Sequence, residues 1–152
     1  MPMRLLPIKH QPQEEDSGCL AACTQMQLLA LGISVSQQAL NKLFALRKGG
    51  VPFPYVRRVE RYGVKVTLAV GDETDLQKAI DQNVPPVIFV RTHQLTSYWK
   101  IDTRHAILVV GYDETHFYLN DPAFPDAPKR VLLDEVMLAW LEFDYAYALI
   151  TR

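Results

Sequence analysis

The sequence predicts an α+β fold in which helices come first and an antiparallel sheet follows. Helical spacing of apolar residues dominates the chain up to Tyr62, whereas short β-branched runs dominate the later part. No strand–helix–strand alternation is visible, so we expect neighbouring strands to run antiparallel. The length of 152 residues, 49% of them hydrophobic, predicts one domain over residues 1–152 with a sizeable core.

Charge and composition exclude several classes of function. The formal net charge is −1 and no Lys/Arg run occurs, so no nucleic-acid or membrane partner is expected. No apolar run is long enough for a membrane span, and residues 1–10 lack the apolar centre of a signal peptide. The two cysteines lie four positions apart in a predicted helix, which is a poor disulfide framework and favours a reducing, cytoplasmic setting.

The first part of the chain predicts an extended arm and three helices. Residues 1–16 are rich in Pro, Gln and Glu and form the arm. Residues 17–31 are apolar nearly all round, which is typical of a buried central helix, and Gly32 ends it. A Ser34/Gln37 capping box predicts the second helix, which ends at Gly49-Gly50. Residues 54–62 form the third helix.

The second part of the chain predicts strands with two helical insertions. Thr74 and Gln77 begin a helix that runs through Asn83, and residues 91–103 form a polar loop. The expected strands cover residues 64–70, 86–90, 104–111, 115–120, 129–133 and 145–151, and the second insertion is a helix over 134–141. Strands 104–111 and 115–120 are close enough in sequence to form a hairpin.

Cys19 is the residue with the clearest chemical signal. It begins the central helix, where unpaired backbone N–H groups and the helix dipole stabilise a thiolate. The dipole contributes about 0.3–1 kcal/mol, which is less than one pKa unit, so most of the activation must come from a paired histidine. Cys23 lies one turn deeper on the same helix and is expected to be a core residue.

His105 is the candidate base because it opens an apolar strand, on the face shared by Ile107 and Val109. The hairpin supplies its partner. A three-residue loop would place Asp121 opposite His105, and a two-residue loop would place Asn120 there. Either side chain could orient the imidazole, and the register alone leaves both open.

Other polar side chains have expected roles around this site. Gln13 precedes Cys19 by six positions, and its amide could join the Cys19 N–H in an oxyanion hole. Tyr98 and Trp99 are candidates for lining a substrate cleft. His10, His93 and His116 are expected at the surface or in loops, and the alternative for His93 is a place in that cleft. A CxxxC pair without further ligands is a weak metal signal, so neither a metal nor a cofactor is expected.

These residues together resemble the papain-like cysteine peptidases that process bacteriocin leaders after a double glycine. The helix start with Gln13, Asp16, Cys19, Ala22, Cys23 and Met26 carries the resemblance, as do the strand His105–Asp113 and Asp121-Pro122. The resemblance implies a papain-like fold, with Cys19 as nucleophile, His105 as base, Asp121 as orienting carboxylate and Gln13 as oxyanion donor. It therefore favours Asp121 over Asn120.

The chain departs from that family at the residue after the nucleophile. Leu20 stands where the family usually has glycine, so we expect it to restrict the cleft. Family members are commonly the first domain of an ABC exporter, and this chain has no such part, so a secretion role is not expected.

The leading hypothesis is a cysteine peptidase acting on a peptide or protein. The alternatives are an amidase or acyltransferase, a silent peptide- or protein-binding relative, and a toxin or effector. Nothing in the sequence specifies an oligomeric state.

Overall fold

The computed structural model describes residues 3–152, so the first two residues of the expected arm lie outside the described part. The elements follow in the order β1 (Arg4–Leu5), α1 (Cys19–Leu29), α2 (Gln37–Leu43), η1 (Phe53–Tyr62), β2 (Lys65–Val70), α3 (Glu73–Asp81), β3 (Val87–Arg91), η2 (Thr92–Gln94), β4 (Arg104–Tyr112), β5 (His116–Asn120), β6 (Lys129–Leu132), α4 (Leu133–Leu141) and β7 (Ala146–Thr151). The predicted α+β class and the order of elements are confirmed. The expected third helix is a 3₁₀ helix, η1.

The strands form one antiparallel sheet in the order β2-β7-β3-β4-β5-β6, and β1 pairs with the end of β4. Strand β7 lies between β2 and β3 and therefore joins the edge strand β2 to the rest of the sheet. At the β1–β4 contact, a Cβ atom on Gly111 would lie 2.5 Å from the carbonyl oxygen of Arg4. Glycine at this position therefore allows the arm to approach the sheet.

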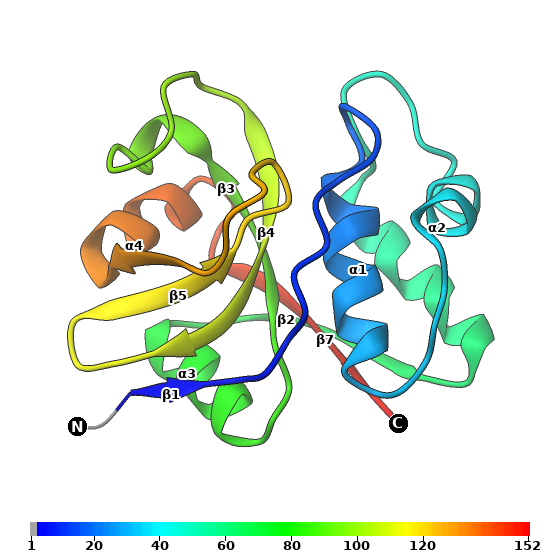
Figure 1. The fold of residues 1–152 in the computed structure, drawn as a ribbon, viewed down its shortest axis with the longest axis horizontal. Coiled ribbons are helices and arrows are strands. Elements are labelled where there is room, and N and C mark those ends of the chain that lie inside the picture. Colours follow the sequence, from blue (N-terminus) through cyan, green and yellow to red (C-terminus); the bar gives the residue numbers. More distant parts are fainter. Residues whose placement is uncertain (1–2) are drawn as a thin grey trace.

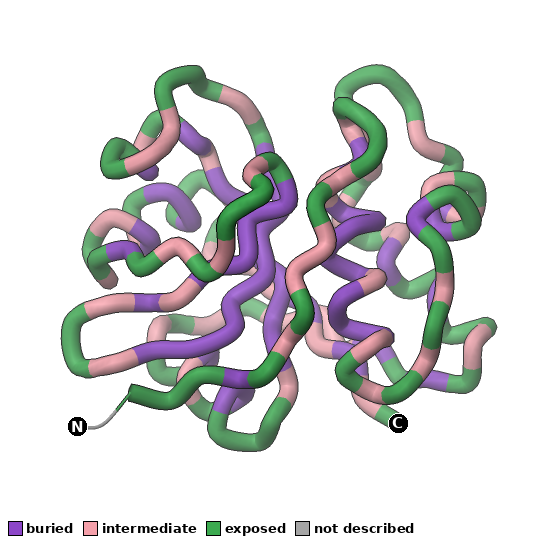
Figure 2. The backbone as a smooth tube through the Cα atoms, in the orientation of Figure 1, coloured by how far each residue is buried: buried purple, intermediate pink, exposed green. Residues whose placement is uncertain are grey.

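Helices cover both faces of the sheet (Figure 1). Helices α1 and α2 and the 3₁₀ helix η1 pack on one face, against Ala106, Leu108 and Val110 of β4. The opposite face, with Ile107 and Val109, packs against α3 and α4. Strand β4 is buried along nearly its whole length, as the continuous purple run in Figure 2 shows. Its alternating side chains therefore supply both cores.

The β4–β5 hairpin differs from both registers considered from the sequence. Tyr112 pairs with Phe117, which leaves four residues in the turn, and the register shifts at a bulge between Val109 and Gly111. The Asp113 carboxylate accepts the backbone N–H groups of Thr115 and His116 at 2.9 and 2.8 Å and so holds the longer turn. Neither Asn120 nor Asp121 stands directly opposite His105, since Leu108 pairs with Asn120 and this is the last pair of the ladder.

The helix starts also differ from the predicted capping boxes. Ser36, rather than Ser34, caps α2 and accepts the N–H of Ala39. Asp72 and Asp75, rather than Thr74 and Gln77, form the capping box of α3. In both helices the observed cap lies two positions from the predicted one and is also a residue type that is favoured at this position.

Gln37 joins the N-terminal arm to α2. Its side-chain amide donates to the carbonyl of Pro12 at 2.9 Å and accepts the N–H of Glu14 at 3.0 Å. On the sheet side, the Gln13 N–H donates to the Pro122 carbonyl at 2.8 Å. The arm is therefore held between α2 and the segment after β5, and Figure 1 shows it running between the α1 side and the β4–β5 side of the molecule.

Within the part of the chain that the structure describes, no helix combines the length and the apolar character that crossing a membrane requires.

Candidate active site

Cys19 is the first residue of α1, and α1 packs against β4 (Figure 1). Gly18 occupies the N-cap, where a Cβ atom would lie 3.2 Å from the carbonyl oxygen of Glu15. This tight turn brings the chain into the helix with the sulfur facing the sheet. The Ala106 backbone N–H points at Sγ over 3.4 Å, so β4 contributes a donor to the thiol.

His105 lies at the start of β4, with only 5% of its surface exposed. Its Nε2 is 2.6 Å from Oδ1 of Asp121, and the ring lies close enough to the Cys19 thiol for each group to shift the pKa of the other. Because Nε2 is engaged by the carboxylate, Nδ1 is the nitrogen left for sulfur. The edge of the Trp99 ring packs against the imidazole with centroids 5.0 Å apart, which restricts rotation of the ring.

Asp121 is completely buried and accepts hydrogen bonds on both oxygens. Oδ2 accepts the Tyr98 hydroxyl at 2.7 Å and the Trp99 indole N–H at 2.8 Å. Oδ1 accepts the Ala123 backbone N–H at 3.0 Å as well as facing His105. This carboxylate can stay ionised out of water because each of its oxygens is hydrogen-bonded.

The structure decides which of the two neighbouring residues faces His105. The Asn120 amide points away, toward the Ile8 carbonyl and the Met26 sulfur. Asp121 reaches the ring although the ladder does not place it opposite, because it follows the last residue of β5 and is free of strand geometry.

Tyr98 and Trp99 lie elsewhere than expected. Neither lines the cavity beside Cys19; both direct their polar groups at Asp121. Burial, followed by the charge of Asp121, raises the pKa of the Tyr98 hydroxyl, so it remains a donor. Their position fits a role in holding the carboxylate.

The charges of the partly buried Cys19 and of the buried His105 and Asp121 favour a thiolate–imidazolium pair. Burial alone would raise the pKa of Cys19, but the hydrogen bond and charge of His105, with the Ala106 and Leu20 N–H groups, lower it overall. Burial opposes the charged form of His105 too, yet bonding to Asp121 and Cys19 raises its pKa to about 10. For Asp121, burial is again outweighed, chiefly by His105, and the pKa is lowered.

Gln13 lies at the same end of the molecule, but its amide is engaged. Nε2 donates to the carbonyls of Glu15 and Asp16 at 3.0 and 2.8 Å, and Oε1 is buried without a partner among the described residues. To donate to an oxyanion, this amide would have to leave at least one of those carbonyls.

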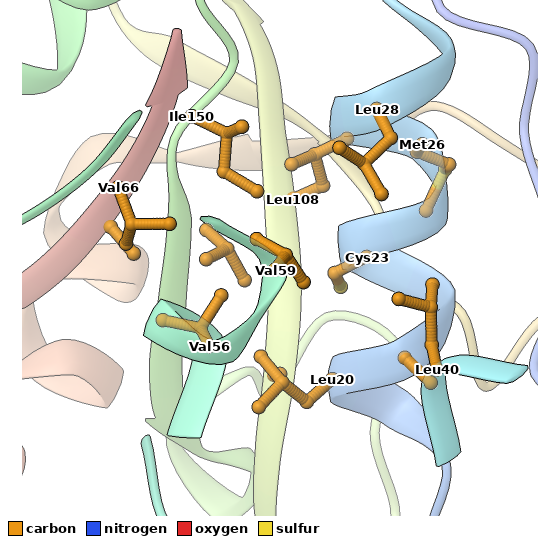
Figure 3. Packing of buried hydrophobic residues seen from close by; sticks show 14 of the residues in the cluster. Leu20, Cys23, Met26, Leu28, Leu40, Val56, Val59, Val66, Leu108 and Ile150 are labelled. Carbon is orange, nitrogen blue, oxygen red and sulfur yellow. The ribbon is translucent and has the colours of Figure 1, made fainter. Parts of the chain in front are cut away.

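Leu20 and Cys23 both point into the core between α1 and η1 (Figure 3). Leu20 is 2% exposed, yet it also forms part of the wall of the cavity beside Cys19. Cys23 is fully buried, and burial, followed by the charges of Cys19 and Asp121, raises its pKa well above the usual value. We therefore expect the two thiols to differ in reactivity.

A cavity of about 540 Å³ opens beside Cys19. One wall is the loop from Arg47 to Phe53, and the other comes from β3, the start of β4 and Phe143. Ser17 ties the loop to the helix start by accepting the Gly49 N–H at 3.3 Å. A volume of this size accommodates several side chains of a peptide.

The remaining histidines do not join the site. His10 bonds to the Phe124 carbonyl, His93 to Asp102, and His116 to Thr115. Among residues 3–152, no group of three or more His, Cys, Asp or Glu side chains is arranged to hold a metal ion.

Sequence reasoning missed the loop that lines the cavity and the two donors to Asp121. Gly49-Gly50 was expected only to end the second helix, whereas both glycines lie in the cavity wall, with positive φ of 95° and 106°. The adjacent aromatic pair Tyr98-Trp99 signalled a site, but its partner could not be identified because the loop that carries it has no periodicity.

Comparison with known proteins agrees with this geometry. The model of the Peptidase_C39 like family matches residues 5–147. A structure from Bacillus anthracis assigned as a C39-like peptidase superposes with a TM-score of 0.82 at 16% identity, covering 100% of this chain and 98% of that one. A search of curated proteins finds no match.

Two transporter peptidase domains share the fold. The peptidase domain of Streptococcus ComA, a bifunctional ABC transporter of a quorum-sensing pathway, has a TM-score of 0.77 at 16% identity, covering 95% of this chain and 98% of that one. A double-glycine-motif protease from an AMS/PCAT transporter, solved with its leader peptide, has a TM-score of 0.76 at 16% identity, covering 97% and 93%.

Proposed function

The chain belongs to the Peptidase_C39 like family, and from that membership we propose that it is a cysteine peptidase that hydrolyses a peptide or protein through a Cys19 thioester. The observation that carries the proposal is the placement of Cys19 and His105 together in the wall of a cavity, with the His105 ring bonded to the buried Asp121 carboxylate. A thiol, an imidazole and a buried carboxylate in this order are the groups that acyl transfer requires.

In the first half of the reaction, the Cys19 thiolate attacks the scissile carbonyl carbon and pushes its electron pair onto the carbonyl oxygen. When the tetrahedral intermediate collapses, the C–N bond breaks and the imidazolium of His105 gives its proton to the leaving amine. Asp121 keeps Nδ1 of the ring aimed at the reacting atoms, and its charge stabilises the imidazolium.

In the second half, neutral His105 takes a proton from water, which attacks the thioester and releases the acid. The thiolate leaves and the ring is again protonated, so the ion pair is restored without any cofactor.

The oxyanion needs donors at the start of α1. The Cys19 backbone N–H has no partner within its own helix because it lies in the first turn. Gln13 becomes a second donor when it exchanges the Glu15 or Asp16 carbonyl for the oxyanion. Losing one such donor costs about 2.7–4 kcal/mol of transition-state stabilisation.

Cleavage of a peptide library tests the proposal, with products identified by mass spectrometry. Wild type should cleave, Cys19→Ala and His105→Gln should not, and Cys23→Ala should retain cleavage because Cys23 is isolated in the core. A thioester at Cys19, trapped in acid and released by hydroxylamine, would identify the intermediate. Equal activity of Cys19→Ala would refute the mechanism.

A second candidate is a catalytically silent relative that binds peptides. Two observations favour it: the Gln13 amide already donates to two backbone carbonyls, and the Leu20 side chain lines the cavity beside the nucleophile. Peptide binding to wild type with no cleavage, together with a Cys19 thiol of ordinary reactivity, would support this candidate instead.

A further inference from the structure

We propose that the cavity beside Cys19 selects peptide segments that carry a bulky apolar side chain next to a carboxylate. This inference rests on the proposed function in so far as the bound peptide is the substrate. Nothing in the family membership specifies this chemistry, which comes from the particular residues that line the cavity in this chain.

The apolar part of the site is a set of three aromatic rings that belong to different elements. Phe53, Phe89 and Phe143 all line the cavity and are all partly exposed. The Phe53 and Phe89 rings meet edge to face with centroids 4.6 Å apart, and those of Phe89 and Phe143 are 5.7 Å apart. Such a surface is expected to bind an aromatic or branched side chain better than glycine.

The charged part of the site consists of three cations. Arg47, Lys48 and Arg104 line the same cavity and are exposed. Among residues 3–152, no carboxylate pairs with these three side chains, and the cavity wall contains no acidic residue. The nearby Arg91 differs, because Asp102 and Glu142 pair with it. Three unpaired cations in one concave surface attract an anionic group.

The geometry also separates this preference from a double-glycine site. Leu20 occupies the cavity wall directly beside the nucleophile, and the adjoining space is wide and aromatic. A glycine pair would leave the three rings in contact with water and so gain little from burial.

Binding to the unreactive Cys19→Ala protein tests the selection without depending on catalysis. Acetyl-Phe-Glu-amide, acetyl-Phe-Gln-amide and acetyl-Gly-Glu-amide would be titrated and followed by NMR. An exposed ion pair contributes about 0.2–1 kcal/mol, so each cation is worth roughly 1.4- to 5-fold in affinity. The acidic Phe peptide should bind most tightly, and added salt should reduce its advantage over the Gln peptide.

Matched variants identify the residues responsible. In the Cys19→Ala background, Arg47→Gln/Lys48→Gln/Arg104→Gln should remove the preference for Glu, and Phe53→Ala should weaken the preference for Phe. Lys78→Gln, an exposed cation on α3 away from the cavity, should change neither. Equal binding of the Glu and Gln peptides, or a Glu preference that survives the triple substitution, would overturn the proposal.

A reactive readout separates this proposal from the peptidase mechanism. These variants are also made with Cys19 retained, and the quantity measured is the rate at which iodoacetate alkylates Cys19 divided by the rate for iodoacetamide. This ratio should fall several-fold in the triple variant and stay unchanged in Lys78→Gln. Selective binding with an ordinary, slow Cys19 would leave the cavity proposal standing and refute the peptidase. A fast Cys19 without charge selection would do the reverse.

Discussion

Two cysteines one helical turn apart lie in opposite chemical environments. Cys19 has a lowered pKa, to which His105 is the main lowering contribution, whereas burial raises that of Cys23. We predict that iodoacetamide labels Cys19 at pH values below 9.0, the pKa of an ordinary thiol, while Cys23 stays unlabelled in the folded protein.

Mass spectrometry of labelled peptides over a pH series would give both rates. In His105→Gln the thiolate loses its partner but keeps its burial, so the Cys19 rate at neutral pH should fall. Labelling of Cys23 at a rate similar to that of Cys19 would contradict the prediction.

Leu20 contributes to both the core and the cavity. Because its side chain is 2% exposed, Leu20→Gly should cost about 2–5 kcal/mol for the lost packing and roughly 1 kcal/mol more for glycine in a helix. The same substitution should admit bulkier reagents to Cys19. Urea unfolding would give the stability, and the rate of a bulky maleimide relative to iodoacetamide would report access.

Leu28→Ala is the matched control, since Leu28 is fully buried in the same helix and does not line the cavity. It should lose comparable stability without a change in the relative labelling rates. Equal changes in both variants would mean that access follows general loosening of α1.

At the scale of elements, the sequence predicted most helices and strands but not how their ends meet. Apolar periodicity placed α1 and β4 and assigned Ala106 and Ile107 to opposite faces, because each pattern extends over many residues. The β4–β5 register depends on one bulge and one carboxylate in the turn, and a single residue of error reverses the faces. Asp121 was favoured over Asn120 through resemblance, not through the register.

Contacts between elements were also beyond reach of the sequence. The Gln37 side-chain amide bonds to the Pro12 carbonyl and the Glu14 N–H, as a neighbouring strand would do with its backbone. A side-chain contact of this kind leaves no periodic pattern in the sequence. The cations of the cavity come from two segments far apart in the sequence, so only the fold brings them together.

The bond between Gln37 and the arm allows a prediction at this scale. Gln37→Leu leaves the Pro12 carbonyl and the Glu14 N–H without this partner, so it should cost about 1–3 kcal/mol. Hydrogen exchange of the Glu14 amide should accelerate. Gln37→Glu keeps an acceptor for that amide and should preserve its protection, even though the donor to Pro12 is lost. Unchanged exchange in Gln37→Leu would show that the arm is held by other contacts.

At the scale of the whole molecule, the buried ion pair should shape stability against pH. The folded His105 has a pKa of about 10, against 6.5 for an ordinary histidine and 9.0 for an ordinary thiol. Above pH 9.0 the unfolded pair has lost both protons, whereas folded His105 still holds one until about pH 10. The folded state therefore binds more protons in this window, and stability falls as pH rises, by about 1.4 kcal/mol per pH unit.

Below that window the folded and unfolded states bind the same number of protons at Cys19 and His105. At pH values above 6.5 and above the lowered pKa of Cys19, but below 9.0, the folded pair holds one proton on His105 and the unfolded pair holds one on the thiol. The pair then adds no pH dependence. Urea unfolding of wild type and of Cys19→Ala/His105→Gln would isolate the effect as a difference. If the stability of wild type relative to the double variant keeps rising above pH 9, the ion pair is contradicted.

The place of β7 has a consequence for biosynthesis. This strand, Ala146–Thr151, fills the gap between β2 and β3 and adds Ala148 and Ile150 to the core. While the ribosome is still making the chain, β2 and β3 have unpaired edges, and neither can find its neighbour until residues near 151 emerge. Open strand edges attract other chains. The nascent chain therefore exposes these edges until Ala146–Thr151 has left the ribosome, and a chain truncated before Ala146 would leave β2 without a partner strand.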